Sequence, residues 1–318
     1  MAPPKQTHTG LVVATHGRHV VVESPDGERR ICHPRGKKSQ AVVGDQVLWS
    51  VSTDEGSIES VQPRRNLFYR QDEIRTKSFA ANIDQSLILL AAEPEFSERQ
   101  LTRALIAAEA QGITPLIVLN KSDLTTLFQA AWERLAPYRN MGYTVLSVCL
   151  GAAQPTGDAD TASAQQAALN GLNERLAGKT TLVLGPSGVG KSTLINHWIP
   201  HALASTNEIS RALNSGKHTT TSTLWYWVDA NKTTALIDSP GFQEFGLHHI
   251  EATQLANLMP DLRRHLGNCK YYNCTHLHEP GCGVISSMKN AQSTESISEN
   301  RYKIYGELFD ELSNIRHW

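Results

Sequence analysis

The sequence has no apolar run long enough to cross a bilayer, which argues against a helical membrane protein. Its first eight residues, MAPPKQTH, lack the apolar core of a secretory signal. The five cysteines are few and odd in number, which argues against a closed disulfide framework and fits a reducing compartment. The net charge of −1 gives no global signal for a nucleic-acid partner, so such a partner must be argued from local patches. We therefore expect a cytoplasmic protein without a membrane partner.

The 318 residues are enough for two or three domains, and three regions differ in their patterns. In the first region, residues 1–70, short apolar segments alternate with turn signals such as Ser24–Gly27. Five short strands in this space predict a small closed barrel, and an OB-fold is the best candidate. The expected strands are Gly10–Thr15, His19–Glu23, Glu28–His33, Gln46–Val51 and Ser57–Val61.

The second region, residues 75–248, alternates strands with helices, which predicts a parallel sheet covered on both faces. A polar stretch, Gly151–Ala164, interrupts the alternation and is expected to be a loop or a mobile insertion. A hairpin turn is expected around Asp229–Lys232. The expected strands are Ile83–Ala91, Ile113–Leu119, Tyr143–Val148, Thr180–Leu184 and Thr234–Ile237, and the expected helices are Ser97–Gln111, Leu127–Tyr138 and one that starts at Lys191.

The third region, residues 249–318, holds three of the five cysteines. It ends in a predicted helix with one apolar side. The residues on that side are Ile297, Ile304, Tyr305, Leu308, Leu312 and Ile315. We expect a mainly helical domain here.

A glycine-rich segment, GPSGVGKS from Gly185, fits the pattern G-x-x-x-x-G-K-[ST]. It follows the apolar strand Thr180–Leu184 and precedes a helix, which is the context that a phosphate-binding loop needs. Lys191 is the expected charge on the β- and γ-phosphates, and Ser192 the expected hydroxyl ligand of Mg²⁺. The segment therefore predicts a nucleoside triphosphate site. Its expected binding residues are Gly185, Pro186, Ser187, Gly188, Val189, Gly190, Lys191, Ser192 and Thr193.

A second motif, Asn120-Lys121-Ser122-Asp123, follows the strand Ile113–Leu119 and predicts the base. The Asp123 carboxylate can accept two hydrogen bonds from guanine, from N1–H and the exocyclic amine, whereas adenine would leave that charge unpaired. Lys121 can lie along the ring face, and Asn120 can hold neighbouring loops. Alone, the motif could be a helix-start loop with Asp123 as N-cap. Together with the phosphate loop it predicts GTP.

A third segment, Asp238-Ser-Pro-Gly241, follows the strand Thr234–Ile237 and is expected to sense the γ-phosphate. Asp238 is the expected water-mediated partner of Mg²⁺, and the Gly241 N–H the expected contact to the γ-phosphate. Upstream, the hydroxyl-rich loop 216–221 should place Thr220 over Mg²⁺ when GTP is bound, although in isolation it could be a polar surface loop.

The group that positions the attacking water is less well indicated. Phe242 stands where many GTPases place a glutamine, and phenylalanine cannot orient water. We expect His218 to take this role, with Gln243 as a weaker candidate; a purely structural histidine is the alternative. The expected catalytic residues are therefore His218, Thr220 and Lys191.

The motifs occur in an unusual order, because Asn120–Asp123 comes before the phosphate loop. The same sheet can be built if the chain is cut elsewhere and its old ends joined, which is a circular permutation. At this point the chain resembles the RsgA (YjeQ) family of circularly permuted GTPases over nearly its full length. Further shared motifs are Val43-Gly-Asp45-Gln-Val47, Ala80-Ala-Asn82-Ile-Asp84-Gln, Gly241-Phe-Gln-Glu-Phe-Gly246-Leu and His278-Glu-Pro-Gly-Cys282.

The resemblance implies an OB-fold barrel, a permuted α/β P-loop GTPase domain and a C-terminal zinc-binding domain. It also implies a ribosome-stimulated GTPase that assists late maturation of the small (30S) ribosomal subunit, binds 16S rRNA through the barrel and the zinc domain, and works as a monomer. GTP hydrolysis would then trigger release. The alternative is a GTP-gated binding switch with negligible hydrolysis. One departure is Ser147-Val-Cys149 in place of the usual guanine-supporting loop, and we assign no strong role there.

A cluster of soft ligands, Cys269-x₄-Cys274-x-His276-x₅-Cys282, predicts one structural Zn²⁺. Four protein ligands leave no open position for chemistry, so the metal should fold this domain. From the spacing alone His278 could replace His276, and the family resemblance favours His276. The other cysteines, Cys32 and Cys149, are interpreted as plain strand residues.

Direct signals for RNA are modest. Arg35, Lys37 and Lys38 form one local basic cluster, and Arg64–Arg70 adds arginines beside Phe68 and Tyr69. Basic and aromatic side chains together suit phosphate contact and base stacking. A solvated charged face is the alternative, and the expectation of rRNA comes mainly from the resemblance.

Overall fold

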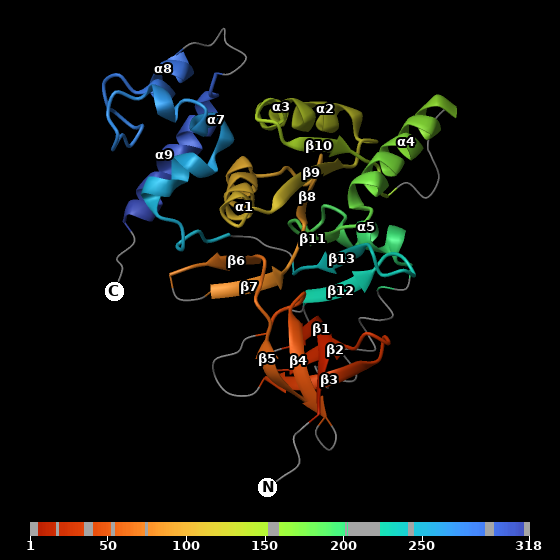
Figure 1. The fold of residues 1–318 in the computed structure, drawn as a ribbon. Coiled ribbons are helices and arrows are strands. Elements are labelled where there is room, and N and C mark those ends of the chain that lie inside the picture. Colours follow the sequence, from red (N-terminus) through yellow and green to blue (C-terminus); the bar gives the residue numbers. More distant parts are fainter. Residues whose placement is uncertain are drawn as a thin grey trace.

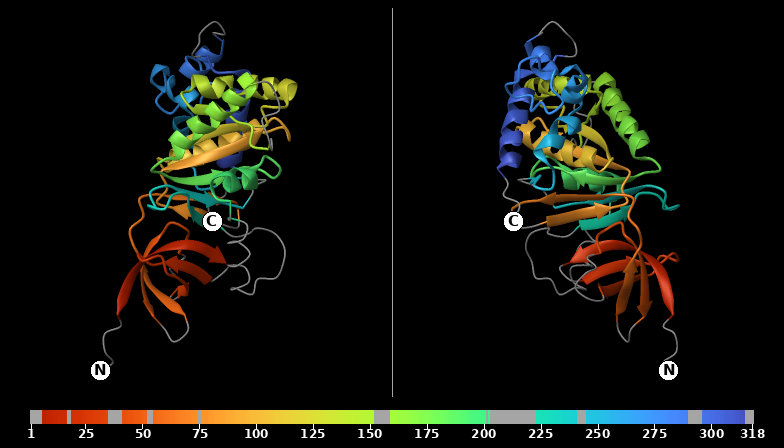
Figure 2. Two further views of the ribbon diagram at one scale, coloured as in Figure 1. Left: turned by 90° about the vertical axis from the view of Figure 1, so that its right-hand side faces the viewer. Right: turned by 60° about the vertical axis from the view of Figure 1, so that its left-hand side comes forward.

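The computed structural model contains an N-terminal barrel, a central α/β domain and a C-terminal helical domain (Figure 1). Figure 2 shows the barrel at the opposite end of the molecule from the C-terminal domain. No helix among the described residues combines the length and the apolar character that a bilayer span requires. The described residues are 6–16, 19–34, 41–51, 55–73, 76–151, 159–200, 202, 223–240, 245–289 and 296–314.

The barrel consists of the five strands that the sequence predicts. They run in the order β1-β2-β3-β5-β4, and β4 pairs back onto β1 to close the barrel. The pairing of β3 with β5 is parallel, whereas its neighbours are antiparallel. Alternate residues point inward and form a separate apolar core that includes Val12, Val22 and Ile58. The expected OB-fold barrel is confirmed. The strands are β1 Thr7–His16, β2 His19–Glu23, β3 Arg29–Pro34, β4 Gln46–Val51 and β5 Gly56–Val61.

A hairpin, β6 Leu67–Gln71 and β7 Thr76–Ala81, joins the barrel to the central domain. Ala80 bridges to Val43 of the barrel, and the Ala81 N–H donates to the Val43 carbonyl at 2.9 Å. Gly44 has φ +90°, and a Cβ there would lie 2.1 Å from the Ala81 oxygen. Only glycine fits this close approach. This close contact explains why a glycine stands at position 44, opposite the alanines at the end of β7.

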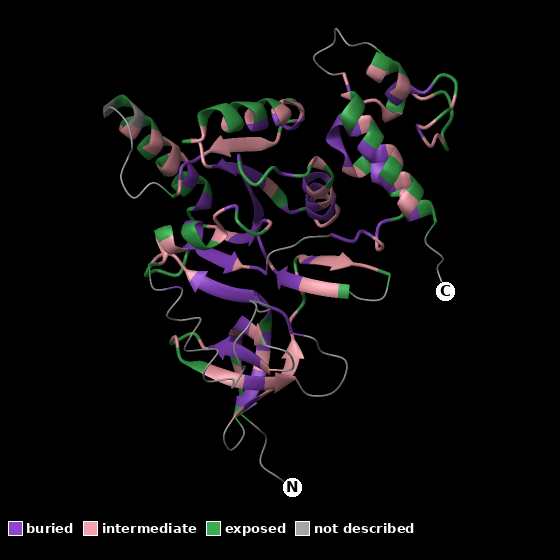
Figure 3. Cartoon of the chain, turned by 180° about the vertical axis from the view of Figure 1, so that it is seen from behind, coloured by how far each residue is buried: buried purple, intermediate pink, exposed green. Residues whose placement is uncertain are grey.

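The central sheet has the strand order β10-β9-β8-β11-β13-β12. The first five strands are parallel, and β12 runs antiparallel to β13 and also pairs with β1. Its strands form the buried centre of the molecule (Figure 3). The expected alternation and the hairpin at Asp229–Lys232 are confirmed. The strands are β8 Gln85–Ala91, β9 Thr114–Asn120, β10 Thr144–Ser147, β11 Thr180–Leu184, β12 Thr223–Trp227 and β13 Ala235–Asp238.

Helices cover both faces of this sheet, with α1 on the side of the C-terminal domain and α4 and α5 on the other (Figure 1). The segment predicted as one helix, Leu127–Tyr138, is two short helices, because the proline at position 137 favours the first turn of a new helix. The loop expected over Gly151–Ala164 is partly wrong, since a helix starts at Ala159. The helices are α1 Glu98–Ala110, α2 Thr125–Arg134, α3 Ala136–Asn140, α4 Ala159–Leu176 and α5 Lys191–Trp198.

The missed helix α4 has few apolar residues, so periodicity does not reveal it. Among its side chains whose burial is described, only Leu172 and Leu176 are fully buried. Its composition is nevertheless rich in alanine, glutamine and leucine, which have high helix propensity. Helix propensity, and not an apolar stripe, was the feature of the sequence that could have predicted this helix.

The C-terminal domain is built from short helices around α9, Glu299–Ser313. Ile304, Tyr305, Leu308 and Leu312 are buried on one side of α9, as the sequence predicts. Ile297 is buried just before the helix, and Ile315 lies outside the described residues. The remaining helices are η1 Ala252–Leu258, α7 Pro260–Arg263, η2 Leu266–Asn268 and α8 Gly283–Lys289.

A buried ion pair inside this domain also contacts the central one. Arg301 of α9 is 2% exposed and donates to both carboxylate oxygens of Asp261, at 2.8 and 3.0 Å. It also donates to the Thr102 hydroxyl of α1 at 2.6 Å. Burial alone would lower the pKa of Arg301, but the Asp261 carboxylate raises it above the ordinary value. The C-terminal domain is therefore docked on α1 through a satisfied buried charge.

Candidate nucleotide site and metal centre

The predicted nucleotide-binding segments meet at one edge of the central sheet. Strands β9, β8, β11 and β13 are parallel neighbours, so their carboxyl ends lie together although their order in the chain is inverted. Strand β9 ends at Asn120 and its loop begins at Lys121, the loop after β11 begins at Gly185, and the loop after β13 begins at Ser239. This edge is where open α/β sheets bind their ligands.

The phosphate loop has the backbone that the glycine motif predicts. Gly188 has φ +83° and Gly190 has φ +101°, in the left-handed region that glycine tolerates. Val189 between them is fully buried and anchors the loop, while Ser187 and Gly188 are exposed. Gly190 is the N-cap of α5, so the unpaired N–H groups and positive end of that helix face the loop. The arrangement suits an anionic ligand.

Lys191 starts α5 and points toward the end of β13. Its Nζ donates to the Ser239 carbonyl at 3.2 Å and lies 3.7 Å from Asp238 Oδ1. That carboxylate oxygen is buried and has no hydrogen-bond partner among the described residues. Burial raises the pKa of Asp238, and Lys191 partly offsets the shift. The half-buried Asp238 carboxylate and the exposed Ser192 hydroxyl, which follows Lys191 in the chain, are oxygen ligands of the kind that Mg²⁺ prefers.

Asn120 ties the base-reading motif to the phosphate loop. Its side chain is 2% exposed, and Nδ2 donates to the Val189 carbonyl at 2.9 Å. Its Oδ1 accepts from the Leu150 N–H at 3.0 Å, so the loop after β10 is held as well. A Cβ on Gly190 would lie 2.5 Å from Nδ2, which explains the glycine at this point. One buried amide thus connects three loops.

The remaining residues of that motif turn away from the strand toward solvent. Lys121 has φ +66°, a left-handed conformation, and the Ser122 N–H donates to the Val148 carbonyl at 3.2 Å. Asp123 is exposed, so its carboxylate is accessible to a ligand. Sequence reasoning missed one contact to it: the Cys149 thiol donates to Asp123 Oδ1 at 3.2 Å.

The interpretation of Cys149 as a strand residue is wrong, because β10 ends at Ser147. Its position just past a strand at the carboxyl edge of the sheet was the signal that could have revealed it. Cys32, in contrast, lies in β3 with no exposed surface, as predicted.

The predicted γ-phosphate sensors lie outside the described residues. These are His218, Thr220 and Gly241, together with Phe242 and Gln243. Directly after them, Phe245 is buried between Phe68 and Phe79 of the β6–β7 hairpin, at ring-centroid distances of 5.5 and 5.9 Å. Phe245 is therefore anchored on the hairpin that joins the barrel to the central domain.

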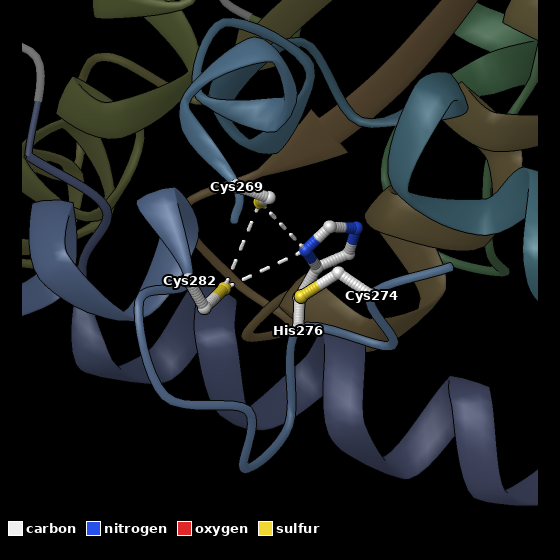
Figure 4. Close-up of side chains that lie close together, drawn as sticks. All are labelled: Cys269, Cys274, His276 and Cys282. Atoms are coloured by element: carbon white, nitrogen blue, oxygen red, sulfur yellow. Dashed lines mark hydrogen bonds between the residues drawn. The ribbon is translucent and has the colours of Figure 1, made fainter. Parts of the chain in front are cut away.

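The predicted metal ligands form a compact cluster (Figure 4). The ligand atoms of Cys269, Cys274, His276 and Cys282 all lie within 4.8 Å of one another. Cys269 Sγ is 3.5 Å from His276 Nδ1 and 4.0 Å from Cys282 Sγ. Tetrahedral coordination with metal–sulfur bonds of about 2.3 Å places ligands about 3.8 Å apart, so the cluster fits such a metal.

The surroundings of the cluster keep one of its thiols protonated unless a cation binds, and they hold the ligand loop. Burial raises the pKa of Cys274 to about 12, so without a cation this thiol would stay protonated. The hydroxyls of Tyr302 and Tyr305 on α9 bond the carbonyls of His276 and Thr275, at 2.8 and 2.6 Å, and hold the ligand loop. The alternative ligand His278 is exposed and does not belong to the cluster, so His276 is the ligand that the geometry supports.

A model of the family described as RsgA GTPase matches residues 61–248. The chain belongs to the RsgA GTPase family. The family membership expected from the sequence is confirmed, and membership of this family makes the protein a GTPase. The name of the family disfavours the alternative of a switch with negligible hydrolysis.

Two curated relatives match this chain over nearly its whole length. A protein of Variovorax paradoxus named small ribosomal subunit biogenesis GTPase RsgA is 67% identical over 98% of this chain and 94% of the relative. A protein of the same name from Paraburkholderia xenovorans is 50% identical over 99% of this chain and 96% of the relative. Among solved structures, YjeQ from Thermotoga maritima aligns with a TM-score of 0.70 and 27% identity, over 98% of this chain and all of that one.

The fold of YloQ, described as a circularly permuted GTPase, aligns with a TM-score of 0.67 at 24% identity. Its likeness extends over 100% of this chain and 99% of that one, so all three parts of the architecture are shared. The inverted motif order in this chain, on a parallel sheet that still brings the loops to one edge, is a circular permutation, as the sequence predicts.

Proposed function

We propose that this RsgA-family GTPase hydrolyses GTP to GDP during late biogenesis of the small (30S) ribosomal subunit. The observation that carries the proposal is the hydrogen bond from Asn120 to the Val189 carbonyl, because it joins the base-reading motif to the phosphate loop. A ligand gripped at both ends by these loops is a guanine nucleotide. The relatives named above supply the ribosomal context.

In this proposal each loop has one task. Asp123 reads guanine, with Lys121 along the base and Ser122 and Asn120 shaping the loop. The N–H groups of 185–193 and the Lys191 ammonium neutralise the phosphates. Mg²⁺, when bound with GTP, screens the phosphate charge, and Ser192, Asp238 and Thr220 are the residues that would hold it. The Gly241 N–H contacts the γ-phosphate, and His218 orients the attacking water.

The other parts of the chain contact the ribosome. We propose three units, an RNA-binding barrel (1–70), a GTPase domain (75–248) and a zinc-binding domain (249–318). The cluster of three thiols and one imidazole suits Zn²⁺, which would hold the last unit together. The barrel and the zinc domain bind 16S rRNA, and hydrolysis releases the protein, which acts as a cytoplasmic monomer.

The test is nucleotide hydrolysis by the purified protein, GTP against ATP, titrated with purified small ribosomal subunits. We expect the protein to hydrolyse GTP but not ATP. Without subunits the rate should be slow, because Phe242 cannot orient water, and it should rise as small subunits are added. Large ribosomal subunits serve as the control and should have no effect. If small subunits bind but leave the rate unchanged, the proposed ribosomal trigger is wrong.

A further inference from the structure

The contact between Cys149 and Asp123 lies inside the proposed guanine site. Cys149 is 8% exposed, and its thiol donates to Asp123 Oδ1 at 3.2 Å. Asp123 itself is exposed, and among the described residues this thiol is the group that donates to its side chain. A carboxylate on a loop loses rotamer freedom when it binds a ligand, which reduces affinity. A donor that already holds the carboxylate removes part of that loss.

Two backbone contacts place Cys149 where it can do this. The Ser122 N–H donates to the Val148 carbonyl at 3.2 Å, on one side of the cysteine. The Leu150 N–H donates to Asn120 Oδ1 at 3.0 Å, on the other side. The segment 148–150 is therefore fixed on the base-reading loop through both neighbours of Cys149. The Cys149 thiol therefore contacts Asp123 from a backbone segment that is held by hydrogen bonds on both sides.

We propose that Cys149 is a positioning residue that sets the selectivity for guanine through Asp123. Each carboxylate oxygen has two lone pairs, so Oδ1 can accept from the thiol and still accept from the base. The thiol keeps the plane of the carboxylate turned so that both oxygens face the two guanine donors. This inference rests on the proposed role of Asp123 and does not depend on the ribosome.

Hypoxanthine separates this role from a general effect on the fold, because it keeps N1–H but lacks the exocyclic amine of guanine. When a base donates two hydrogen bonds to one carboxylate, the carboxylate must have the correct orientation. A base that donates only one hydrogen bond tolerates rotation of the carboxylate. Loss of the Cys149 thiol should therefore weaken binding of guanine nucleotides more than that of inosine nucleotides. A merely structural defect would weaken both equally.

The test measures dissociation constants for GDP and IDP by calorimetry on the full chain. For Cys149→Ala we expect the preference for GDP over IDP to fall about threefold to tenfold, the range for one ordinary hydrogen bond, because a thiol is a weak donor even to a carboxylate. Cys149→Ser keeps a donor and should retain the preference. Cys32→Ala removes a buried thiol from the barrel and serves as the matched control, with no change expected. An unchanged preference in Cys149→Ala would overturn the inference.

The same measurements on the Asp123→Ala variant distinguish failure of this inference from failure of the proposed guanine site. Asp123→Ala should abolish the preference for GDP over IDP, and adding Cys149→Ala to it should change nothing more. If Asp123→Ala keeps the preference, the proposed base reader is wrong. If Asp123→Ala loses the preference but Cys149→Ala weakens both nucleotides equally, so that the preference is unchanged, the site stands and the positioning role of Cys149 is wrong.

Discussion

The nucleotide site and the metal cluster are built in opposite ways. The metal ligands come from one short segment, Cys269–Cys282, whose ligand loop has no sheet beneath it. The nucleotide site takes its residues from loops that follow β9, β11 and β13, three largely buried strands spread between Thr114 and Asp238. A local site can be encoded by spacing alone, whereas a dispersed site needs the whole sheet to exist first.

The difference predicts what each ligand does for its site. Parallel strands hold the nucleotide loops, and Asn120 joins them, so the site is largely formed before GTP arrives. The loop of the metal ligands is held by two tyrosine hydroxyls of α9, and the proposed zinc would hold it further. Removing zinc should therefore remove structure, and removing nucleotide contacts should remove only chemistry.

Loss of the metal should have the largest effect. Structural zinc contributes about 10 kcal/mol or more to small metal domains, so Cys282→Ser or a strong chelator should unfold the C-terminal domain. Limited proteolysis should then cut residues 249–318 first, and metal analysis should show less than one zinc per chain. His278→Ala, in the same loop, is the control and should keep zinc and resistance. Full zinc content in Cys282→Ser would contradict this comparison.

Loss of the phosphate charge should abolish activity without loss of fold. Lys191→Ala removes the cation expected on the β- and γ-phosphates, and comparable electrostatic contacts are worth about 10²- to 10³-fold in rate. The melting temperature without nucleotide should change little, because Lys191 makes few contacts besides Ser239 and Asp238. Lys303→Ala, an exposed lysine on α9, matches the charge change and should keep full activity. Near-normal hydrolysis by Lys191→Ala would be inconsistent with the proposed site.

Loss of the amide that joins the loops should have the smallest effect. Asn120→Ala leaves the Leu150 N–H and the Val189 carbonyl without their partner and should cost about 1–3 kcal/mol of stability. Both GTP affinity and unfolding free energy should fall, since the same side chain serves the fold and the site. Denaturant melts and nucleotide titrations on the same samples measure the two. Unchanged stability together with unchanged affinity would show that the sheet alone sets the loops.

Much of the fold could be predicted from local patterns. The barrel strands, β11 and the start of α5 follow from periodicity and turn residues, and Ser97 and Ser298 begin their helices as N-caps. Helix α4 could not be predicted in this way, because its apolar stripe is weak. The break before α3 depends on one proline that periodicity ignores.

The site shows the same division between local and distant information. The phosphate loop and the metal ligands were readable because their spacing carries the chemistry. The contact of Cys149 with Asp123, and that of Arg301 with Asp261 and Thr102, join residues far apart in the sequence. An arginine on an apolar helix side gives no local sign that a carboxylate will meet it. Such pairs appear only when the tertiary fold is known.

The most direct test is the base specificity of Asp123→Asn. Asparagine offers a donor where aspartate accepts, and xanthine carries an oxygen in place of the exocyclic amine of guanine, so the variant should hydrolyse XTP in preference to GTP. With saturating XTP its rate should match that of the wild type with GTP, because the phosphate loop is untouched. A variant that still prefers GTP would show that the loops after β9 and β11 do not grip the same nucleotide.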